Sequence, residues 1–294
     1  PSDSRSTPAP VQCNDEGADD YDVCGYDYDY AFKKVFIDFC GHSPSLVARE
    51  AFAGAGNQNN ALHEALDACL DSEYWRGIDG RVWNLANAKI GPVQAVKSGM
   101  DSGPIALADY ADDYAYWTWT QTDDRDVRLV LVGQEFVKAT YSAGKTVYEP
   151  WDRSPGEDYT ARGYDQYQAV VKDRRAGLLT HRWFLMSNTM FTAIPRTTAA
   201  QAYRAFLGYD IARLEGLNPV PSEPADYDRK GVQVQACANC HSTLDPMSYP
   251  FSRYQGIGDS VGFDNQYQYV KYRLDGFVRS DGEGVVDTPE AGVL

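Results

Sequence analysis

The sequence predicts a mainly α-helical fold, a multi-helix scaffold interrupted by long irregular loops. Apolar residues recur at steps of three and four in several segments, which is the period of an amphipathic helix. Stretches rich in Gly, Pro and Asp separate these segments and predict the loops. With 294 residues, 43% of them hydrophobic, the chain is long enough for one large domain or two ordinary ones.

The chain begins with a segment that predicts a flexible acidic linker over residues 1–20. It is rich in Pro, Ser and Asp, a composition that buries too little apolar surface to order itself. The following stretch packs acids against tyrosines, with Asp20, Asp22, Asp27 and Asp29 close together. Calcium binding is one interpretation of these aspartates, but the ligand order and the glycine of an EF-hand are absent. The pattern favours a solvated acidic face.

Three helices are predicted next. The first begins at Ala31, ends at Gly41 and carries an apolar stripe of Phe32, Val35, Phe36 and Phe39. Ser43 can cap a second helix, with Pro44 in its first turn, where a missing N–H costs nothing. The third runs over 60–70 and places Leu62, Leu66 and Cys69 on one stripe.

Four of the six cysteines lie in the N-terminal quarter and predict a disulfide-stapled helical module over 21–105. They are Cys13, Cys24, Cys40 and Cys69, and four cysteines allow three pairings. Proximity in the sequence favours Cys13 with Cys24 and Cys40 with Cys69. Disulfides imply an oxidising compartment.

The middle of the chain, residues 106–172, is rich in aromatic residues. Gly and Pro over 91–104 predict a loop ahead of it, and a second loop is predicted over 142–163. The apolar run 127–137 fits either a strand or a buried helix, because its periodicity does not distinguish them. Helical steps separate Tyr110, Tyr114 and Trp117.

Two helices are predicted ahead of the last cysteines. The first covers 174–190, presents a broad apolar surface, and is broken at Pro195. Thr197 or Thr198 caps the second, a long helix that Gly216 closes.

The chemistry of the chain is concentrated in one motif, Cys237-Ala-Asn-Cys240-His241, within a predicted module over 173–294. Two thiols three positions apart on one helical turn can each form a thioether with the same porphyrin, and the adjacent imidazole then faces the iron. This spacing is typical of covalent attachment of haem c. A disulfide or half of a zinc site is the alternative, but zinc needs two further ligands, and no second CxxC or HxxxH occurs.

The residues around this motif resemble a known family. Segments 178–190 and 194–208, followed by the pattern CxxCHxxxDP that ends in Asp245-Pro246, are similar to the haem modules of large secreted cytochromes of the planctomycete cytochrome c type, which also occur in myxobacteria. Segments 31–52 and 65–77 resemble the opening module of that family more loosely. The resemblance implies one covalent haem, with Pro246 beside it, and a place outside the cytoplasm. Asp245-Pro246 is expected to stop the haem helix. Members of that family usually continue with a C-terminal helical module, which would begin where this chain ends.

The ligand opposite His241 decides the chemistry of the iron. Met247 lies too close to His241 in sequence to swing across the ring, so we expect it to pack against the haem edge. Met190 is the first candidate for the sixth ligand and His181 the second, with an open face as the alternative. Met186 is a further candidate on the same predicted helix, and Met100, His42 and His63 are more remote.

The favoured function is single-electron transfer by a secreted monohaem cytochrome. A haem enzyme of peroxidase or oxidase type is the alternative, with His181 and Arg196 as distal acid and charge stabiliser. A structural subunit of a larger assembly or filament is the third hypothesis. The formal charge of −15 argues against nucleic acid and fits a redox partner protein or other cytochrome subunits. No apolar run approaches a membrane-spanning length. Because no signal peptide is present at Pro1, we expect a mature periplasmic, cell-surface or extracellular chain.

Overall fold

The structure is a computed structural model that describes residues 27–90, 111–150, 174–181, 184–185, 194–255 and 271–272. The described part is mainly helical, as the sequence predicts. It divides between Trp75 and Arg76 into two compact units, here called unit 1 and unit 2. The predicted linker, the loop over 91–104, and the cysteines Cys13 and Cys24 lie outside the described residues, as do Asp20 and Asp22.

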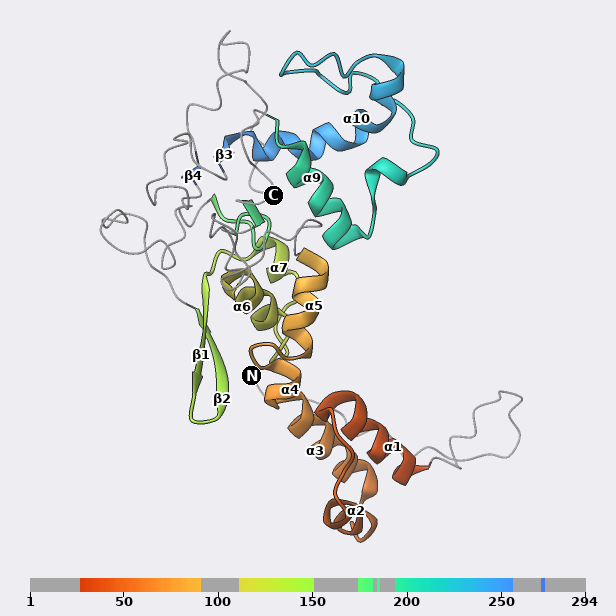
Figure 1. Ribbon diagram of the computed structural model, residues 1–294, viewed down its shortest axis with the longest axis vertical. Helices are drawn as coiled ribbons and strands as arrows, with labels where there is room; N and C mark the ends of the chain where they lie inside the picture. Colours follow the sequence, from red (N-terminus) through yellow and green to blue (C-terminus); the bar gives the residue numbers. More distant parts are fainter. Residues whose placement is uncertain are drawn as a thin grey trace, which may run out of the picture. The chain divides into compact units, whose positions relative to one another are not determined.

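The described part of unit 1 is built on three helices, held by aromatic contacts and one disulfide (Figure 1). They are α1 (Tyr28–Val35), continued by a π-helical turn over Phe36–Cys40, α2 (Leu46–Ala53) and α3 (Gln58–Leu70). The rings of Phe32 and Phe52 stack at 4.1 Å between α1 and α2. A disulfide joins Cys40 to the buried Cys69 and so ties the end of the first helix to α3. This is the pairing that sequence proximity favours.

The ends of these helices follow local hydrogen bonding. Asp27 caps α1 by accepting a hydrogen bond from the N–H of Tyr30, and Asp29 pairs with Arg49 at 3.2 Å. The two described aspartates of the acidic stretch therefore have roles within the helices. Gly41 adopts a left-handed conformation (φ 77°) and ends the first helix where the sequence predicts.

The predicted start of the second helix was wrong by a few residues. Ser45, not Ser43, caps α2 by accepting a hydrogen bond from the N–H of Ala48. Pro44 is buried just ahead of this cap, outside the helix. Either serine can cap a helix through its hydroxyl. Ser45 comes after Pro44, so its backbone angles are free of the restriction that a proline places on the residue before it.

Unit 2 begins with helices and a β-hairpin. A short helix, α4 (Glu73–Arg76), contains the division between the two units and ends at the first residue of unit 2. The helices α5 (Arg81–Ile90), α6 (Ala111–Thr120) and α7 (Leu129–Val132) follow. Strands β1 (Val137–Ser142) and β2 (Lys145–Pro150) pair antiparallel, with Val137 opposite Pro150. The hydroxyl of Tyr148 donates a hydrogen bond to the carbonyl oxygen of Arg76, which fixes the hairpin to the start of the unit.

The hairpin corrects the prediction of a loop over 142–163, because its second strand occupies the start of that range. Ala143 and Gly144 have positive φ (53° and 81°) and form a two-residue turn of the kind that matches strand twist. Thr146 and Tyr148 are buried at alternate positions of β2, the period of a half-exposed strand. The ambiguous run 127–137 contains both a short helix, α7, and the first residue of β1.

The predicted helix over 174–190 is also wrong in its described first half, which forms turns from 174 to 181. The N–H of Gly177 bonds to the carbonyl of Gly133, and the N–H of Leu178 to that of Val130. Gly177 has a left-handed conformation (φ 49°), and a Cβ there would overlap the carbonyl oxygen of Val130. The segment therefore combines turn bonds of its own, from the N–H groups of Leu179, Thr180 and His181, with these two bonds to the backbone at α7, and does not form a regular helix.

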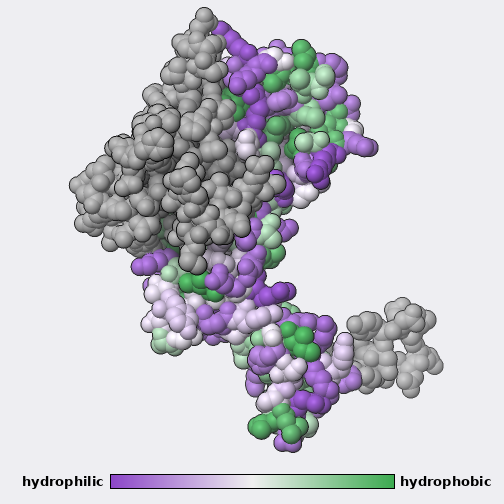
Figure 2. Space-filling model, in the orientation of Figure 1, coloured by the Kyte–Doolittle hydropathy of each residue, from purple (hydrophilic) through white to green (hydrophobic). Residues whose placement is uncertain are grey.

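The C-terminal part of unit 2 is built on α9 (Arg196–Ala202) and α10 (Gln235–Ser248), which pack against each other (Figure 1). A π-helical turn over Tyr203–Leu207 continues α9, and 3-10 turns cover Ile211–Arg213 and Tyr249–Arg253. Strands β3 (Tyr254–Gln255) and β4 (Lys271–Tyr272) form an antiparallel pair. In the space-filling view, hydrophilic and hydrophobic side chains are mixed over this region (Figure 2).

Two helix boundaries here differ from the prediction. The helix that begins at Arg196 ends at Gly208 (φ 71°) instead of Gly216, and neither Thr197 nor Thr198 caps it, because both lie inside its first turn. Separately, α10 does not stop at Asp245-Pro246.

The last turn of α10 continues past the proline to Ser248. It is held by the N–H of Tyr249, which bonds to the Asp245 carbonyl, and by the Ser248 hydroxyl, which donates to the Leu244 carbonyl. These bonds stabilise the helix where Pro246 supplies no N–H.

Candidate functional site

Helix α10 presents two distinct faces, and the cysteine motif lies on the more exposed one. The buried face carries Ala238, Ser242 and Asp245, which recur at steps of three and four, and the buried Tyr249 follows directly after the helix. The adjacent face is half-buried and carries Cys237, Cys240, His241, Leu244 and Met247. A half-buried stripe of thiols, thioether and leucine is the kind of surface on which a flat apolar group can lie.

The residues of the motif fit a covalently attached haem. Cys237 and Cys240 are both free and half-buried, and their spacing places them on the same turn of α10. His241 follows at the position that shares this face with Cys237. The donor set is therefore two accessible thiols and one imidazole on one helical turn, which matches the chemistry of thioether attachment plus axial ligation.

The imidazole of His241 is oriented by a carboxylate one turn further along the helix. Its Nδ1 lies 2.8 Å from Oδ1 of Asp245, which is completely buried. An ionised carboxylate can only accept hydrogen bonds, so the proton of a neutral imidazole must be on Nδ1. The lone pair of Nε2 is then available to bind a metal.

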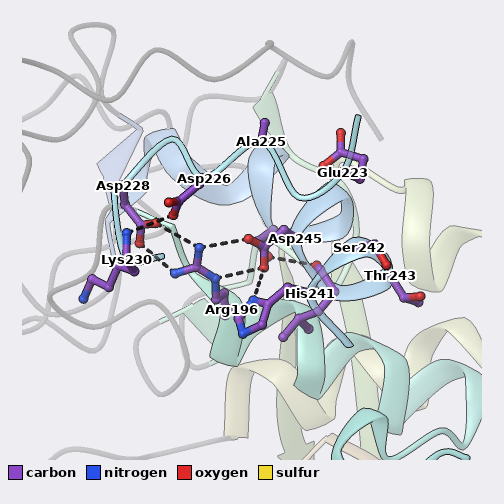
Figure 3. A network of polar contacts seen from close by, with 12 residues as sticks. Arg196, Glu223, Ala225, Asp226, Asp228, Lys230, His241, Ser242, Thr243 and Asp245 are labelled. Atoms are coloured by element: carbon purple, nitrogen blue, oxygen red, sulfur yellow. Dashed lines mark hydrogen bonds and ion pairs between the residues drawn. The ribbon is translucent and has the colours of Figure 1, made fainter. Parts of the chain in front are cut away.

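Arg196 holds this carboxylate in place from the first residue of α9 (Figure 3). Its Nε and one terminal nitrogen each donate a 2.9 Å hydrogen bond to Asp245. Its terminal nitrogens also donate to the two carboxylate oxygens of Asp228, at 2.7 and 2.9 Å. The result is a continuous polar network, Asp228–Arg196–Asp245–His241, in which both aspartates are buried.

Arg196 is the basic centre of the network. Burial acts to lower the pKa of the Arg196 guanidinium, but the hydrogen bonds to Asp245 and Asp228 outweigh it and raise that pKa further above its ordinary value. Bidentate, charge-assisted bonds of this kind favour the ionised form of both partners. The network contains two carboxyl groups and one guanidinium, so its acidic groups outnumber its basic one.

The connector between α9 and α10 supplies Asp228 and is fixed to α10 by side chains. Asp226 accepts hydrogen bonds from the N–H groups of Lys230 and Gly231, which shapes the turn that carries Asp228. The hydroxyl of Tyr249 donates to Glu223 at 2.7 Å and accepts a bond from the N–H of Ala225. The position of Asp228 is therefore determined by the connector as well as by Arg196.

The structure places the two candidate histidines in separate environments. His181 is buried, with its ring 4.5 Å from that of Tyr116 and 5.7 Å from that of Phe136. Its Nδ1 lies 3.4 Å from Asp113, and neither ring nitrogen makes a hydrogen bond within the described residues. Among the residues that the structure describes, the contacts of His181 and those of His241 have no residue in common.

The other predicted ligands are distributed widely. Met190, Met186 and Met100 lie outside the described residues, so the sixth-ligand prediction on Met190 stays a prediction. His42 and His63 are exposed in unit 1. Arg196, considered above as a distal residue, instead bonds to the carboxylate on the Nδ1 side of His241.

Sequence reasoning missed the role of two acidic residues. The sequence analysis assigns Asp245 to a helix stop and to the CxxCHxxxDP pattern, although its spacing of four from His241 also indicates that the two side chains can meet on a helix. Asp228 carries no comparable signal, because its partner Arg196 is 32 residues away.

Across the described ranges, no cluster of three or more His, Cys, Asp or Glu side chains is arranged to hold a metal ion on its own. No helix in the same ranges is long and apolar enough to cross a membrane. No protein-family model matches the chain, and no match was found among curated proteins or solved structures.

Proposed function

We propose that this protein is a monohaem c-type cytochrome that transfers single electrons outside the cytoplasm, as a member of the planctomycete cytochrome c type. The observation that carries the proposal is the placement of Cys237, Cys240 and His241 on one half-buried face of α10, with Nδ1 of His241 bonded to Asp245. A haem bound there supplies a one-electron redox couple at iron.

The chain's own residues have defined roles in this proposal. Cys237 and Cys240 would hold the group by thioether bonds. His241 would bind its iron through Nε2, with the ring fixed by Asp245. Leu244 and Met247 lie on the same face of α10 and would shield the group from water.

The charge of the chain and its disulfide support a secreted carrier. The formal charge of −15 favours a redox partner with a basic surface, because opposite charges steer encounter between proteins. Other cytochrome subunits of a larger extracellular or surface assembly are the second kind of partner in the proposal. The Cys40–Cys69 disulfide is compatible with an oxidising compartment.

The test is to produce the chain in a bacterial periplasm equipped for haem attachment. Intact-mass measurement is expected to give the mass of the chain plus one haem, and the pyridine spectrum that of two saturated thioether links. The matched control changes Cys237 and Cys240 to Ala, which leaves His241 and its network in place. Covalent haem in the control, or none in the wild-type chain, would overturn the proposal.

Further measurements on the same material separate electron transfer from its alternatives. A carrier is expected to show six-coordinate iron that reduces reversibly and is indifferent to peroxide and cyanide. Turnover of peroxide by a five-coordinate iron would instead identify a haem enzyme. Native mass then separates a free carrier, which is a monomer, from a subunit of an assembly.

A further inference from the structure

We propose that Asp245, held by Arg196 and Asp228, is a positioning residue that gives His241 imidazolate character and so lowers the reduction potential of an iron bound at Nε2. The inference rests on the proposed function, because it concerns the same site, and it adds how the protein sets the redox behaviour of that site.

The first step is the identity of the acceptor. The hydrogen bond from Nδ1 of His241 ends on a carboxylate oxygen of Asp245, at 2.8 Å. A carboxylate is a stronger acceptor than a neutral backbone carbonyl, and a charge-assisted bond is roughly twice as strong as a neutral one. It therefore withdraws the Nδ1 proton further from the ring, which makes Nε2 a more basic ligand.

The second step is that Arg196 does not cancel this effect. Its guanidinium is divided between Asp245 and Asp228, with two hydrogen bonds to each. A guanidinium paired with Asp245 alone would neutralise that carboxylate, whereas sharing it with Asp228 leaves the network with an excess negative charge. Asp228 is thus coupled to His241 without touching it.

The third step is burial. Asp245 is completely buried and Asp228 is 6% exposed, so water screens the network poorly. Charge and hydrogen bonds act more strongly in such a medium than at the surface. A negative charge and a more basic ligand both stabilise ferric over ferrous iron. In the half-reaction concerned, one electron from a mediator reduces ferric to ferrous iron, and the proton stays between Nδ1 and Asp245.

The test is a potentiometric titration of the haem-loaded Asp245→Asn variant at fixed pH. Asparagine can still accept the Nδ1 hydrogen bond but carries no charge. The equilibrium constant for one-electron reduction is expected to rise at least tenfold, which corresponds to about 59 mV. The matched control is Asp123→Asn. Asp123 forms ion pairs with Arg76 and Arg125, and none of these three residues belongs to the His241 network. The control is expected to leave the potential unchanged.

A second variant, Asp228→Asn, keeps the contact between Asp245 and His241. The positive charge of Arg196 is then balanced by Asp245 alone. The equilibrium constant for one-electron reduction is therefore expected to rise, as in Asp245→Asn, but by about threefold. This variant decides the matter if Asp245→Asn does not fold. Loaded variants whose potentials equal that of the wild type would overturn the inference while leaving the proposed function intact. A wild-type chain without covalent haem would instead be a failure of the proposed function.

Discussion

Nδ1 of His241 and Oδ1 of Asp245 lie 2.8 Å apart across a single turn of α10. The spacing of four residues brings the two side chains together on a helix, and Arg196 fixes the carboxylate from outside that helix. The orientation of the histidine is therefore built into the chain before any ligand binds. This property is what allows the site to be tested without haem.

We expect neutral His241 to carry its proton on Nδ1 in the haem-free protein. The buried carboxylate of Asp245 can only accept a hydrogen bond. In the alternative tautomer, the unprotonated Nδ1 of His241 would face this carboxylate, so two acceptors would oppose each other. The ¹⁵N shifts of the ring nitrogens, read by long-range ¹H–¹⁵N correlation at mildly alkaline pH, report the tautomer directly. The exposed His63 is the internal control and is expected to show a mixture. Protonation of His241 mainly on Nε2 would contradict the assignment.

Arg196→Met is expected to destabilise unit 2 by about 3–5 kcal/mol, because it leaves two buried carboxylates without their partner. Urea denaturation followed by circular dichroism measures the loss. The control is Arg213→Met, whose arginine is 86% exposed and pairs with Asp210. That change is expected to cost less than about 1 kcal/mol. Equal losses in the two variants would mean that the network contributes no more than a surface pair.

The parts of the fold that sequence reasoning predicted are those determined by local patterns. The helices of unit 1 follow from the apolar stripe that begins at Phe32 and from Gly41, which ends it. The cysteine motif is likewise local, because Cys237, Cys240 and His241 lie within five consecutive residues. Local hydrogen bonding and side-chain spacing are sufficient to specify such features.

The errors arise where distant backbone competes with a local pattern. Residues 174–181 have an apolar pattern that suits a helix, but the N–H groups of Gly177 and Leu178 bond to the backbone of α7 and of the residue that follows it. The network of the site has the same origin, because Arg196 and Asp228 meet through folding and not through spacing. Sequence alone does not indicate which arginine a buried aspartate will meet.

Gly177→Ala tests this competition. A Cβ at Gly177 would overlap the Val130 carbonyl oxygen, and the residue has φ of 49°. We expect a loss of about 2–4 kcal/mol, from the left-handed backbone and the overlap together. Gly208→Ala is the matched control, because φ is 71° and a Cβ there meets nothing within 4 Å. It is expected to cost only about 1–2 kcal/mol. Denaturation midpoints that are the same for both variants would show that the close approach to α7 is unimportant.

Removal of the disulfide is expected to destabilise unit 1 by about 3–4 kcal/mol. Cys40 and Cys69 are 29 residues apart, and closing a loop of that length restricts the unfolded chain by this amount in the chain-entropy model. The change is Cys40→Ala with Cys69→Ala, and hydrogen exchange of the amides of α1 and α3 measures it. Amides of α10, in unit 2, serve as the internal reference. Unchanged protection in α1 and α3 would contradict a stabilising role for the bond.

The stability of unit 2 is expected to fall in acid partly through Asp123. Burial acts to raise the pKa of this carboxyl, but hydrogen bonds from Arg76 and Arg125 outweigh it and lower the pKa below its ordinary value of 3.8. A carboxyl whose pKa is lowered by folding contributes stability that is fully present above its unfolded pKa. That contribution is lost as the pH falls through the folded pKa. The loss should therefore begin near pH 4 and continue below it.

Asp123→Asn removes this contribution and leaves the backbone unstrained, because asparagine tolerates the positive φ of 60° found there. Urea midpoints of unit 2, measured from about pH 6 down to about pH 2, give the comparison. The variant is expected to be less stable than the wild type at neutral pH, and the difference should shrink as the acid titrates Asp123. A difference that stays constant over the whole range would mean that the loss comes from packing and not from the charge of Asp123.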